Sequence, residues 1–417
     1  MSYIKDVVVK DFSIFGLNGD QVSLGGEISA LMSLDYGESV FEPVIKLVAT
    51  FAATEKISSL LPLRGTETAT LKLVHPSGIL EFDDLVVQGL VELNTTSTST
   101  VFSVNLTTPD NIFNEQRKLT KRYEPTVKIS DHVERILKSD LRTEKPYDIE
   151  ETANSTGFYG NYWTPFKAIY WLAKRSMSKT SSDDGSGTDR VGYLFWETKS
   201  GYNFKSIDTI AANSKDNVVQ EFFQSEIAEE DSRFIRTFES VTNNSDFHIF
   251  NPFFERDQDI INQMRKGLYS DSVSFINIHS LAPDTGQDLN YSEVFKRQTH
   301  FGGEKDLVDL AFNVNENGGH QTIEPFIDGT MIKDGKIDYN KTGNGEDNPH
   351  KVISQSRMKY MSMSSMSLRI TVPFNLELEA GLPIMVNLIS SGRGLDKQRS
   401  GVYLIKDLRH SYLPEGS

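Results

Sequence analysis

The sequence predicts an α+β, multidomain protein. Its 417 residues exceed the roughly 100 to 200 residues that one domain usually takes. Segments in which apolar and polar residues alternate gather in the first 110 residues and again near the C-terminus. Between these two regions the spacing of apolar residues changes to that of helices, with polar stretches in between. We therefore expect two β units separated by mixed α/β insertions.

Residues 1–110 form the first predicted β unit. Its strands are expected near residues 7–9, 45–49, 69–74, 85–87 and 101–106, separated by turn residues. The alternation is clearest at Thr70, Leu71, Lys72 and Leu73, whose side chains must point to opposite faces of a strand in turn. This pattern favours a small closed or sandwiched β domain that ends near Pro109.

Residues 111–140 change to a helical period. A helix is expected to begin near Ser130, and residues 142–157 are interpreted as a polar linker. A second helix follows Thr164, with Pro165 at its first position and an apolar face made by Phe166, Ile169, Tyr170, Ala173 and Met177. A Gly, Ser and Asp-rich loop then leads to a hairpin of strands at 193–196 and 203–206.

The remaining residues give weaker patterns until the C-terminus. We expect a helical patch within 217–238, a strand at 234–239, a helix at 257–268 and a strand at 273–278. Residues 318–348 are dense in Gly, Asp and Asn and are typical of an insertion with little core of its own. A short helix at 352–360 precedes strands at 368–372, 384–388 and 402–405, which predict the second β unit.

Three groups of segments together resemble a known family. The first runs from Trp163 through the aromatic helix and the polar loop to Tyr193-Leu194-Phe195-Trp196-Glu197-Thr198, Gly201-Tyr202-Asn203-Phe204 and Ser206-Ile207-Asp208. The second comprises Gln355-Ser356-Arg357-Met358 and residues 367–373, 378–384 and 401–410, and the third and weakest is 265–269. In order and content, over about two thirds of the chain, these segments are similar to the central baseplate hub proteins of contractile-tailed bacteriophages.

The resemblance implies a fold and an assembly. Two tube-like β-barrel domains of similar topology would carry α/β insertions, and three chains would form a ring-shaped homotrimer. The implied domains are 1–110, the first tube-like domain; 111–205, a helix and hairpin insertion; 206–245 with 352–417, a discontinuous second tube-like domain; and 246–351, an inserted peripheral domain. The trimer would join the sixfold tail tube to the threefold central spike.

The same resemblance implies partners and a location. Tail tube proteins would bind on one side, the central spike protein on the other, and wedge proteins of the baseplate around the ring. DNA would pass through an axial channel without specific binding. The protein would be assembled in the host cytoplasm and reside in the tail baseplate of the virion. Two alternatives remain open, a tail-associated cell-wall hydrolase and a glycan-binding receptor protein.

The composition excludes several kinds of binding site and reactive group. A formal net charge of −15 and a pI near 5.1 give no overall basic footprint for wrapping duplex DNA. Without cysteine, the chain has no disulfides, thiol nucleophiles or Cys-ligated metals. Its start lacks the pattern of a secretory signal, and no apolar run approaches the roughly 20 residues of a membrane span.

No catalytic, cofactor-binding or metal site is predicted, and no cofactor. The sequence lacks a Gly-x-Ser-x-Gly elbow, a phosphate-binding Gly-x-x-x-x-Gly-Lys loop and a His-Glu-x-x-His helix. The histidines are interpreted as packing or surface residues, and the Asp-Gly pairs at 328–335 as turns, because their spacing fails that of a calcium loop. Trp163, Trp171 and Trp196 are assigned to core packing before sugar stacking. Four methionines fit a core or a soft interface equally well: Met358, Met361, Met363 and Met366.

Overall fold

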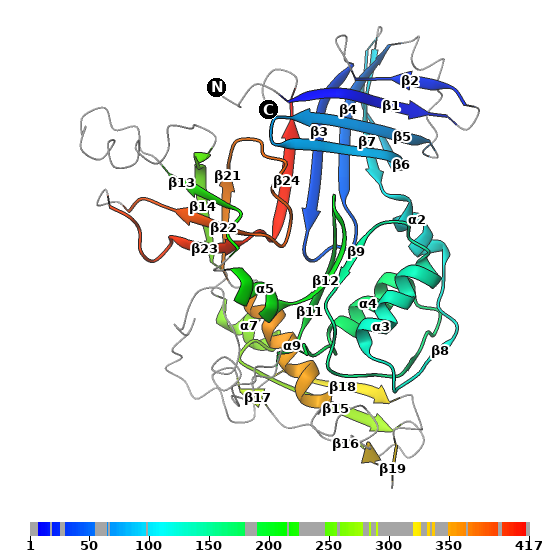
Figure 1. Ribbon diagram of the computed structural model, residues 1–417, viewed down its shortest axis with the longest axis vertical. Coiled ribbons are helices and arrows are strands. Elements are labelled where there is room, and N and C mark those ends of the chain that lie inside the picture. The colour runs from blue at the N-terminus through cyan, green and yellow to red at the C-terminus, as the bar shows by residue number, and fades with distance from the viewer. Residues whose placement is uncertain are drawn as a thin grey trace.

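The protein is mostly β-structure with a few short helices (Figure 1). The computed structural model describes residues 7–16, 19–25, 30–54, 65, 67–96, 99–179, 190–214, 217–224, 247–256, 259–277, 283–284, 289–290, 320–326, 332–333, 336–337, 349–363, 366–390 and 394–413. No helix within these residues is long and apolar enough to cross a membrane.

An eight-stranded antiparallel sheet contains the first β unit, in the order β2-β1-β5-β6-β7-β4-β3-β24. Its strands are β1 (Val8–Phe15), β2 (Gln21–Ser23), β3 (Leu31–Ser39), β4 (Lys46–Thr54), β5 (Thr68–His75), β6 (Gly78–Thr95), β7 (Ser99–Thr107) and β24 (Asp407–Tyr412). Alternate side chains, such as Leu71 and Leu73 on β5, enter a core that also holds Phe12 and Phe51. The strands predicted in this region are confirmed, whereas β2 and β3 gave no clear signal.

The last strand of this sheet comes from the other end of the chain. β24 pairs with β3, with His410 opposite Tyr36, and thus closes one edge of the first unit with residues that were expected in the second β unit. The two termini of the described chain therefore share one sheet, as Figure 1 shows in blue and red.

A helix and hairpin unit follows the sheet and has its own aromatic core. It comprises α2 (Pro109–Gln116), β8 (Arg122–Tyr123), α3 (Ile129–Arg135), a π-helical turn (Ile136–Leu141), β9 (Tyr147–Ile149), β10 (Phe158–Tyr159), α4 (Pro165–Ala173), β11 (Tyr193–Thr198) and β12 (Gly201–Ser206). The predicted helices and the hairpin are confirmed, although α4 ends before Met177. The interpretation of 142–157 as a mere linker is wrong, because β9 lies there and pairs in parallel with β12.

Two small sheets make the second β unit. One has the order β13-β22-β23, and the other pairs β14 with β21. Their strands are β13 (Gln220–Phe223), β14 (Phe250–Arg256), β21 (Met366–Thr371), β22 (Pro383–Asn387) and β23 (Gly401–Leu404). A shared core of Phe222, Ile249, Leu378, Val386 and their neighbours joins the two sheets, as the three C-terminal strand predictions implied.

One prediction in this region is wrong. Residues 217–238 were expected to carry a helical patch, but Gln220–Phe223 form a strand that pairs in parallel with β22. The cause is tertiary: Phe222 is fully buried in the core between the sheets, and the sheet supplies backbone partners that a short apolar run cannot specify alone. The strand expected at 234–239 lies outside the described residues.

The remaining elements include a largely buried helix, α9, that packs on β15. They are α5 (Ile207–Ser214), α7 (Ile260–Arg265), β15 (Ser270–Asn277), β16 (Pro283–Asp284), β17 (Leu289–Asn290), β18 (His320–Phe326), β19 (Ile332–Lys333), β20 (Lys336–Ile337) and α9 (Pro349–Met363). Ile353 of α9 packs with Val273 and Phe275 of β15. The predicted helices at 257–268 and 352–360 and the strand at 273–278 are confirmed, and most of the predicted insertion at 318–348 lies outside the described residues.

Candidate functional site: the buried hairpin junction

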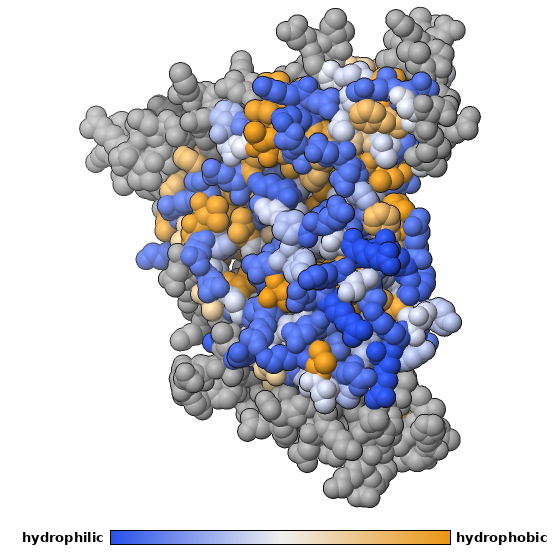
Figure 2. Space-filling model, turned by 45° about the vertical axis from the view of Figure 1, so that its right-hand side comes forward, coloured by the Kyte–Doolittle hydropathy of each residue, from blue (hydrophilic) through white to orange (hydrophobic). Residues whose placement is uncertain are grey.

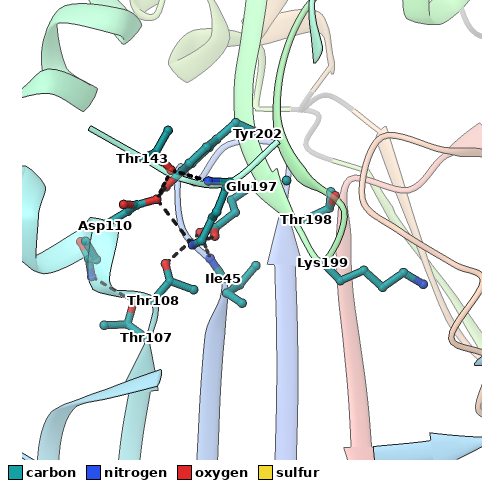
Figure 3. Close-up of polar contacts among 12 residues, drawn as sticks. Ile45, Thr107, Thr108, Asp110, Thr143, Glu197, Thr198, Lys199 and Tyr202 are labelled. Carbon is teal, nitrogen blue, oxygen red and sulfur yellow. Dashed lines mark hydrogen bonds and ion pairs between the residues drawn. The ribbon is translucent and has the colours of Figure 1, made fainter. Parts of the chain in front are cut away.

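The β11–β12 hairpin carries a buried carboxylate that ties three parts of the chain together. Glu197, whose side chain is 1% exposed, forms an ion pair with Lys145 from the segment before β9. It also accepts hydrogen bonds from the backbone N–H of Ile45, at 3.1 Å, and from the hydroxyl of Thr108, at 3.3 Å. Figure 3 shows Glu197 pointing toward these groups from the hairpin. The carboxylate therefore links the hairpin to the first sheet and to the start of α2.

A second carboxylate completes this cluster. Asp110, at the start of α2, accepts hydrogen bonds from Thr143, at 2.6 Å, and from the Tyr202 hydroxyl, at 3.1 Å. Lys145 lies 3.7 Å from the same oxygen, so one ammonium group neutralises two buried acids. Burial raises the pKa of Glu197, and the charge of Lys145 opposes that shift. Burial and the two acids also raise the pKa of Tyr202, so its hydroxyl remains a proton donor.

Glu38 of β3 makes a similar junction at the other side of the hairpin. It accepts hydrogen bonds from the Tyr36 hydroxyl and from two backbone N–H groups, those of Lys199 at 2.9 Å and Ala380 at 2.8 Å. Its side chain is buried, and this burial raises its pKa to about 7. One side chain thus holds β3, the hairpin turn and the segment that leads into β22.

Trp196 binds the segment before β22, residues 376–381, to the hairpin. Its indole N–H donates to the carbonyl of Ala380 at 2.9 Å. Gly381 has φ +92°, and a Cβ at this position would lie 2.5 Å from the Trp196 ring, so only glycine fits. Lys199 donates to the carbonyl of Leu376, whose N–H is bonded to Ser77 of the first unit. We call these interacting residues the hairpin junction. Its members are Tyr36, Glu38, Ile45, Ser77, Thr108, Asp110, Thr143, Lys145, Trp196, Glu197, Lys199, Tyr202, Leu376 and Ala380.

The hairpin junction fixes positions and does not present chemistry to solvent. Glu197, Asp110 and Glu38 each accept hydrogen bonds from two or more segments, and the side chain of Glu197 is only 1% exposed. A general acid or base has to reach a substrate proton within hydrogen-bonding distance. These groups instead stabilise the relative placement of the first sheet, α2, the hairpin and the segment 376–381.

Most of the described residues that were assigned to packing are buried or partly buried. Trp196 is 3% exposed, and Trp163 and Trp171 pack, partly buried, against the aromatic core. Met358 is buried, whereas Met361 and Met363 are partly exposed. His75, His132 and His410 are buried, and burial lowers the pKa of His410 to about 4. The Asp-Gly pairs at 328–335 lie outside the described residues, within which no group of three or more acidic or histidine side chains could hold a metal.

The hairpin junction was not predicted from the sequence. Its members come from residues 36–45, 77, 108–110, 143–145, 196–202 and 376–381, and nothing in the sequence links them. The available signal was Glu197 itself, a charged residue directly after the aromatic and aliphatic run Tyr193-Leu194-Phe195-Trp196. An acid in such a strand must be paired when it is buried, which would have indicated a partner elsewhere.

The fold can be compared with known structures. It is similar to the tail protein from Neisseria meningitidis MC58, with a TM-score of 0.53 and 9% sequence identity over 97% of this chain and 93% of that chain. The 43 kDa tail protein of prophage MuSo2 from Shewanella oneidensis gives a TM-score of 0.51 and 10% identity over 98% and 95%. No family model matches the sequence, and no curated protein matches it. The chain therefore has the fold of phage tail proteins, and its resemblance to baseplate hub proteins is confirmed as a resemblance of fold.

Proposed function

We propose that the chain is the central hub of the tail baseplate of a contractile-tailed bacteriophage. Three copies form a ring that joins the sixfold tail tube to the threefold central spike, and an axial channel lets the DNA pass. The observation that carries the proposal is the shared fold with two tail proteins over nearly the full length of each chain. A likeness confined to one β unit would be a much weaker argument, since a single small sheet serves many functions.

The hairpin junction supports this role physically. A hub that connects two parts of a tail has to keep its β units at fixed positions while its partners bind. Glu197 and Glu38 do this with buried hydrogen bonds to five separate segments, instead of relying on a flexible linker. Such charge-assisted hydrogen bonds are stronger than neutral ones and require a specific geometry.

The proposal assigns the two β units to equivalent places around the ring. Residues 1–110, and 206–245 with 352–417, would each imitate one tube subunit, so three chains would present six. Residues 111–205 and 246–351 would lie at the periphery. Tube, spike and wedge proteins would be the partners, within the virion, and no catalytic step is part of this role.

The test is the mass of the purified chain. Light scattering should give about three times the chain mass of 46.9 kDa, and electron microscopy should show a threefold ring. The interfaces should be those of a permanent complex, on the order of 2,000 Å² or more. A monomer whose mass does not change with concentration would contradict the proposal. So would unrelated strand orders in the two β units of an experimental ring structure.

The hydrolase alternative has less support. A glycosidase needs two carboxyl groups about 5 to 10 Å apart that can reach a sugar ring. Glu197 and Asp110 share Lys145 and so lie close together, but both are buried and bonded to their own protein partners. If purified protein cleared peptidoglycan in a zymogram, and substitution of one Asp or Glu abolished the clearing, this ranking would be reversed.

A further inference from the structure

A short two-stranded ribbon on the helix and hairpin unit presents an unusual surface. β8 and β10 pair so that Arg122 lies opposite Tyr159, and an isolated bridge continues the pairing from Leu119 to Trp163. The inward side chains, Leu119, Tyr123 and Phe158, are buried in the aromatic core. Outward side chains alternate with them: Lys118, Arg122, Tyr159 and Tyr162 are exposed. We call residues 117–123 and 158–163 the aromatic–basic ribbon.

The ribbon is locally basic in an acidic protein. Four of its six residues from 117 to 122 are Lys or Arg, while the whole chain carries −15. Lys121 is paired with Asp140 at 2.6 Å, but neither Lys118 nor the neighbouring Lys167 has an ion-pair partner within the described residues. The acidic residues Glu115 and Glu124 bound the stretch at either end. Positive charge is thus concentrated on this stretch of the chain.

The backbone of Tyr162 is hydrogen-bonded to the ribbon while its ring is exposed to solvent. Tyr162 is 73% exposed, and Tyr159 is 51% exposed, whereas large aromatic side chains usually gain by burial. Asn161 and Tyr162 have φ angles of +46° and +58°, a left-handed conformation that Asn adopts readily but that costs roughly 1–2 kcal/mol at a residue such as Tyr162. The N–H of Tyr162 donates to the carbonyl of Leu119 at 2.9 Å, and the N–H of Gly160 donates to that of Lys121 at 3.0 Å. Backbone strain that leaves an aromatic ring in water is typical of a binding surface.

Helix α4 extends the surface with alternating aromatic and cationic residues. Trp163, Lys167, Trp171 and Arg175 follow one another at a spacing of four residues. The Lys167 ammonium lies 5.4 Å from the Trp163 ring, and the Arg175 guanidinium lies 3.7 Å from the Trp171 ring. The two indoles are 5.7 Å apart. These contacts hold long side chains in place, so less conformational entropy is lost when a partner binds.

We propose that the aromatic–basic ribbon, with Lys167 beside it, is a docking surface for an acidic face of another protein. Tyr, Trp and Arg are the residues that contribute most to protein interfaces, and confined positive charge selects a partner rich in carboxylates. Nucleic acid fits less well, because the overall charge repels phosphates and two glutamates bound the basic stretch. Figure 2 turns the side that carries α2 and β8 toward the viewer, and the most hydrophilic residues gather on its lower right.

The proposal can be tested with the intact chain and three labelled probes. These are a 16-residue peptide of Glu, Asp, Ala and Leu, the same peptide with Gln and Asn in place of the acids, and a 16-nucleotide single-stranded DNA. Fluorescence anisotropy should show binding of the acidic peptide that weakens as salt rises from about 50 to 200 mM. Lys118→Glu and Tyr162→Ala should each weaken it about tenfold or more. Lys397→Glu, the same charge change at an exposed loop position of the second β unit, should leave it unchanged.

The binding and unfolding measurements distinguish docking of an acidic protein from binding of nucleic acid and from loss of folding. Because Lys118 and Tyr162 are exposed, both variants should unfold at the wild-type temperature. The proposal is wrong if the acidic peptide does not bind, if the amide peptide binds equally, or if the variants match Lys397→Glu. Tighter binding of the DNA would assign the ribbon to nucleic acid. None of these outcomes depends on the oligomeric state, so they leave the hub proposal to its own test.

Discussion

Removal of Lys145 tests whether the hairpin junction holds the units together. Lys145→Met retains the aliphatic stem but deletes the only ammonium that contacts Glu197 within the described residues. Glu197 is then left with the Ile45 N–H and the Thr108 hydroxyl, at 1% side-chain exposure. Breaking a buried ion pair from one side costs about 3–5 kcal/mol. We expect about 3 kcal/mol, because two hydrogen bonds remain and Lys145 itself is 23% exposed.

The pH dependence of this loss identifies its cause. The pKa of Glu197 is already raised by burial, and it should rise further without Lys145. Its folded-state pKa then lies above its unfolded value, so the variant is most stable below the unfolded pKa and loses stability as pH rises. Urea unfolding followed by tryptophan fluorescence should therefore show a larger deficit for Lys145→Met at pH 8 than at pH 5. Trp196, next to Glu197, reports on the junction directly.

Two further variants make the test specific. Lys46→Met removes an ion pair between Lys46 and Glu42, whose side chains are 62% and 42% exposed. This variant should change the free energy of unfolding by no more than about 1 kcal/mol. Lys145→Met combined with Glu197→Gln removes both charges and should recover much of the loss. The reasoning is refuted if Lys145→Met behaves like Lys46→Met, or if the double variant is as unstable as the single one.

Four other predictions concern separate features. Burial raises the pKa of Glu38 from an ordinary 4.5 to about 7. The stability that this group contributes is therefore full below about pH 4.5 and is lost as the pH rises through 7. Glu38→Gln should flatten this part of a plot of unfolding free energy against pH. Gly160→Ala places a Cβ 2.5 Å from the Leu119 carbonyl and should cost about 1–3 kcal/mol in denaturant unfolding, whereas Gly394→Ala, with open space around it, should cost less than about 0.5. In a structure of the assembled ring, Asp and Glu should outnumber Lys and Arg on the surface that faces the axis. Acidic walls would keep DNA from adhering, which would give the chain charge of −15 a use. A neutral or basic lining would contradict the proposed channel but not the proposed hub. Purified protein should release no soluble product from peptidoglycan, as measured by a dye-release assay with lysozyme as positive control.

Local patterns in the sequence determined most of the elements. Alternation predicted five strands of the first sheet, and Thr164 with Pro165 marked the start of α4, because side-chain period and helix-start chemistry act within a few residues. Recognition of the tail-protein fold also came from the sequence, since the aromatic segments 159–208 and the C-terminal strands keep their order along the chain. The absence of cysteine by itself excluded disulfides, thiol nucleophiles and Cys-ligated metals, because each of these needs a thiol.

Only the tertiary structure decided where distant segments meet. A sheet edge has no local signature for its partner, so the pairing of β24 with β3 could not be read from either strand. Phe222 became part of a strand because β22 offered backbone partners beside a shared core. Glu38 is an ordinary acid in the sequence, and Glu197 stands out only because it follows four apolar or aromatic residues. Their burial, raised pKa values and partners exist only once four other segments have packed around the hairpin.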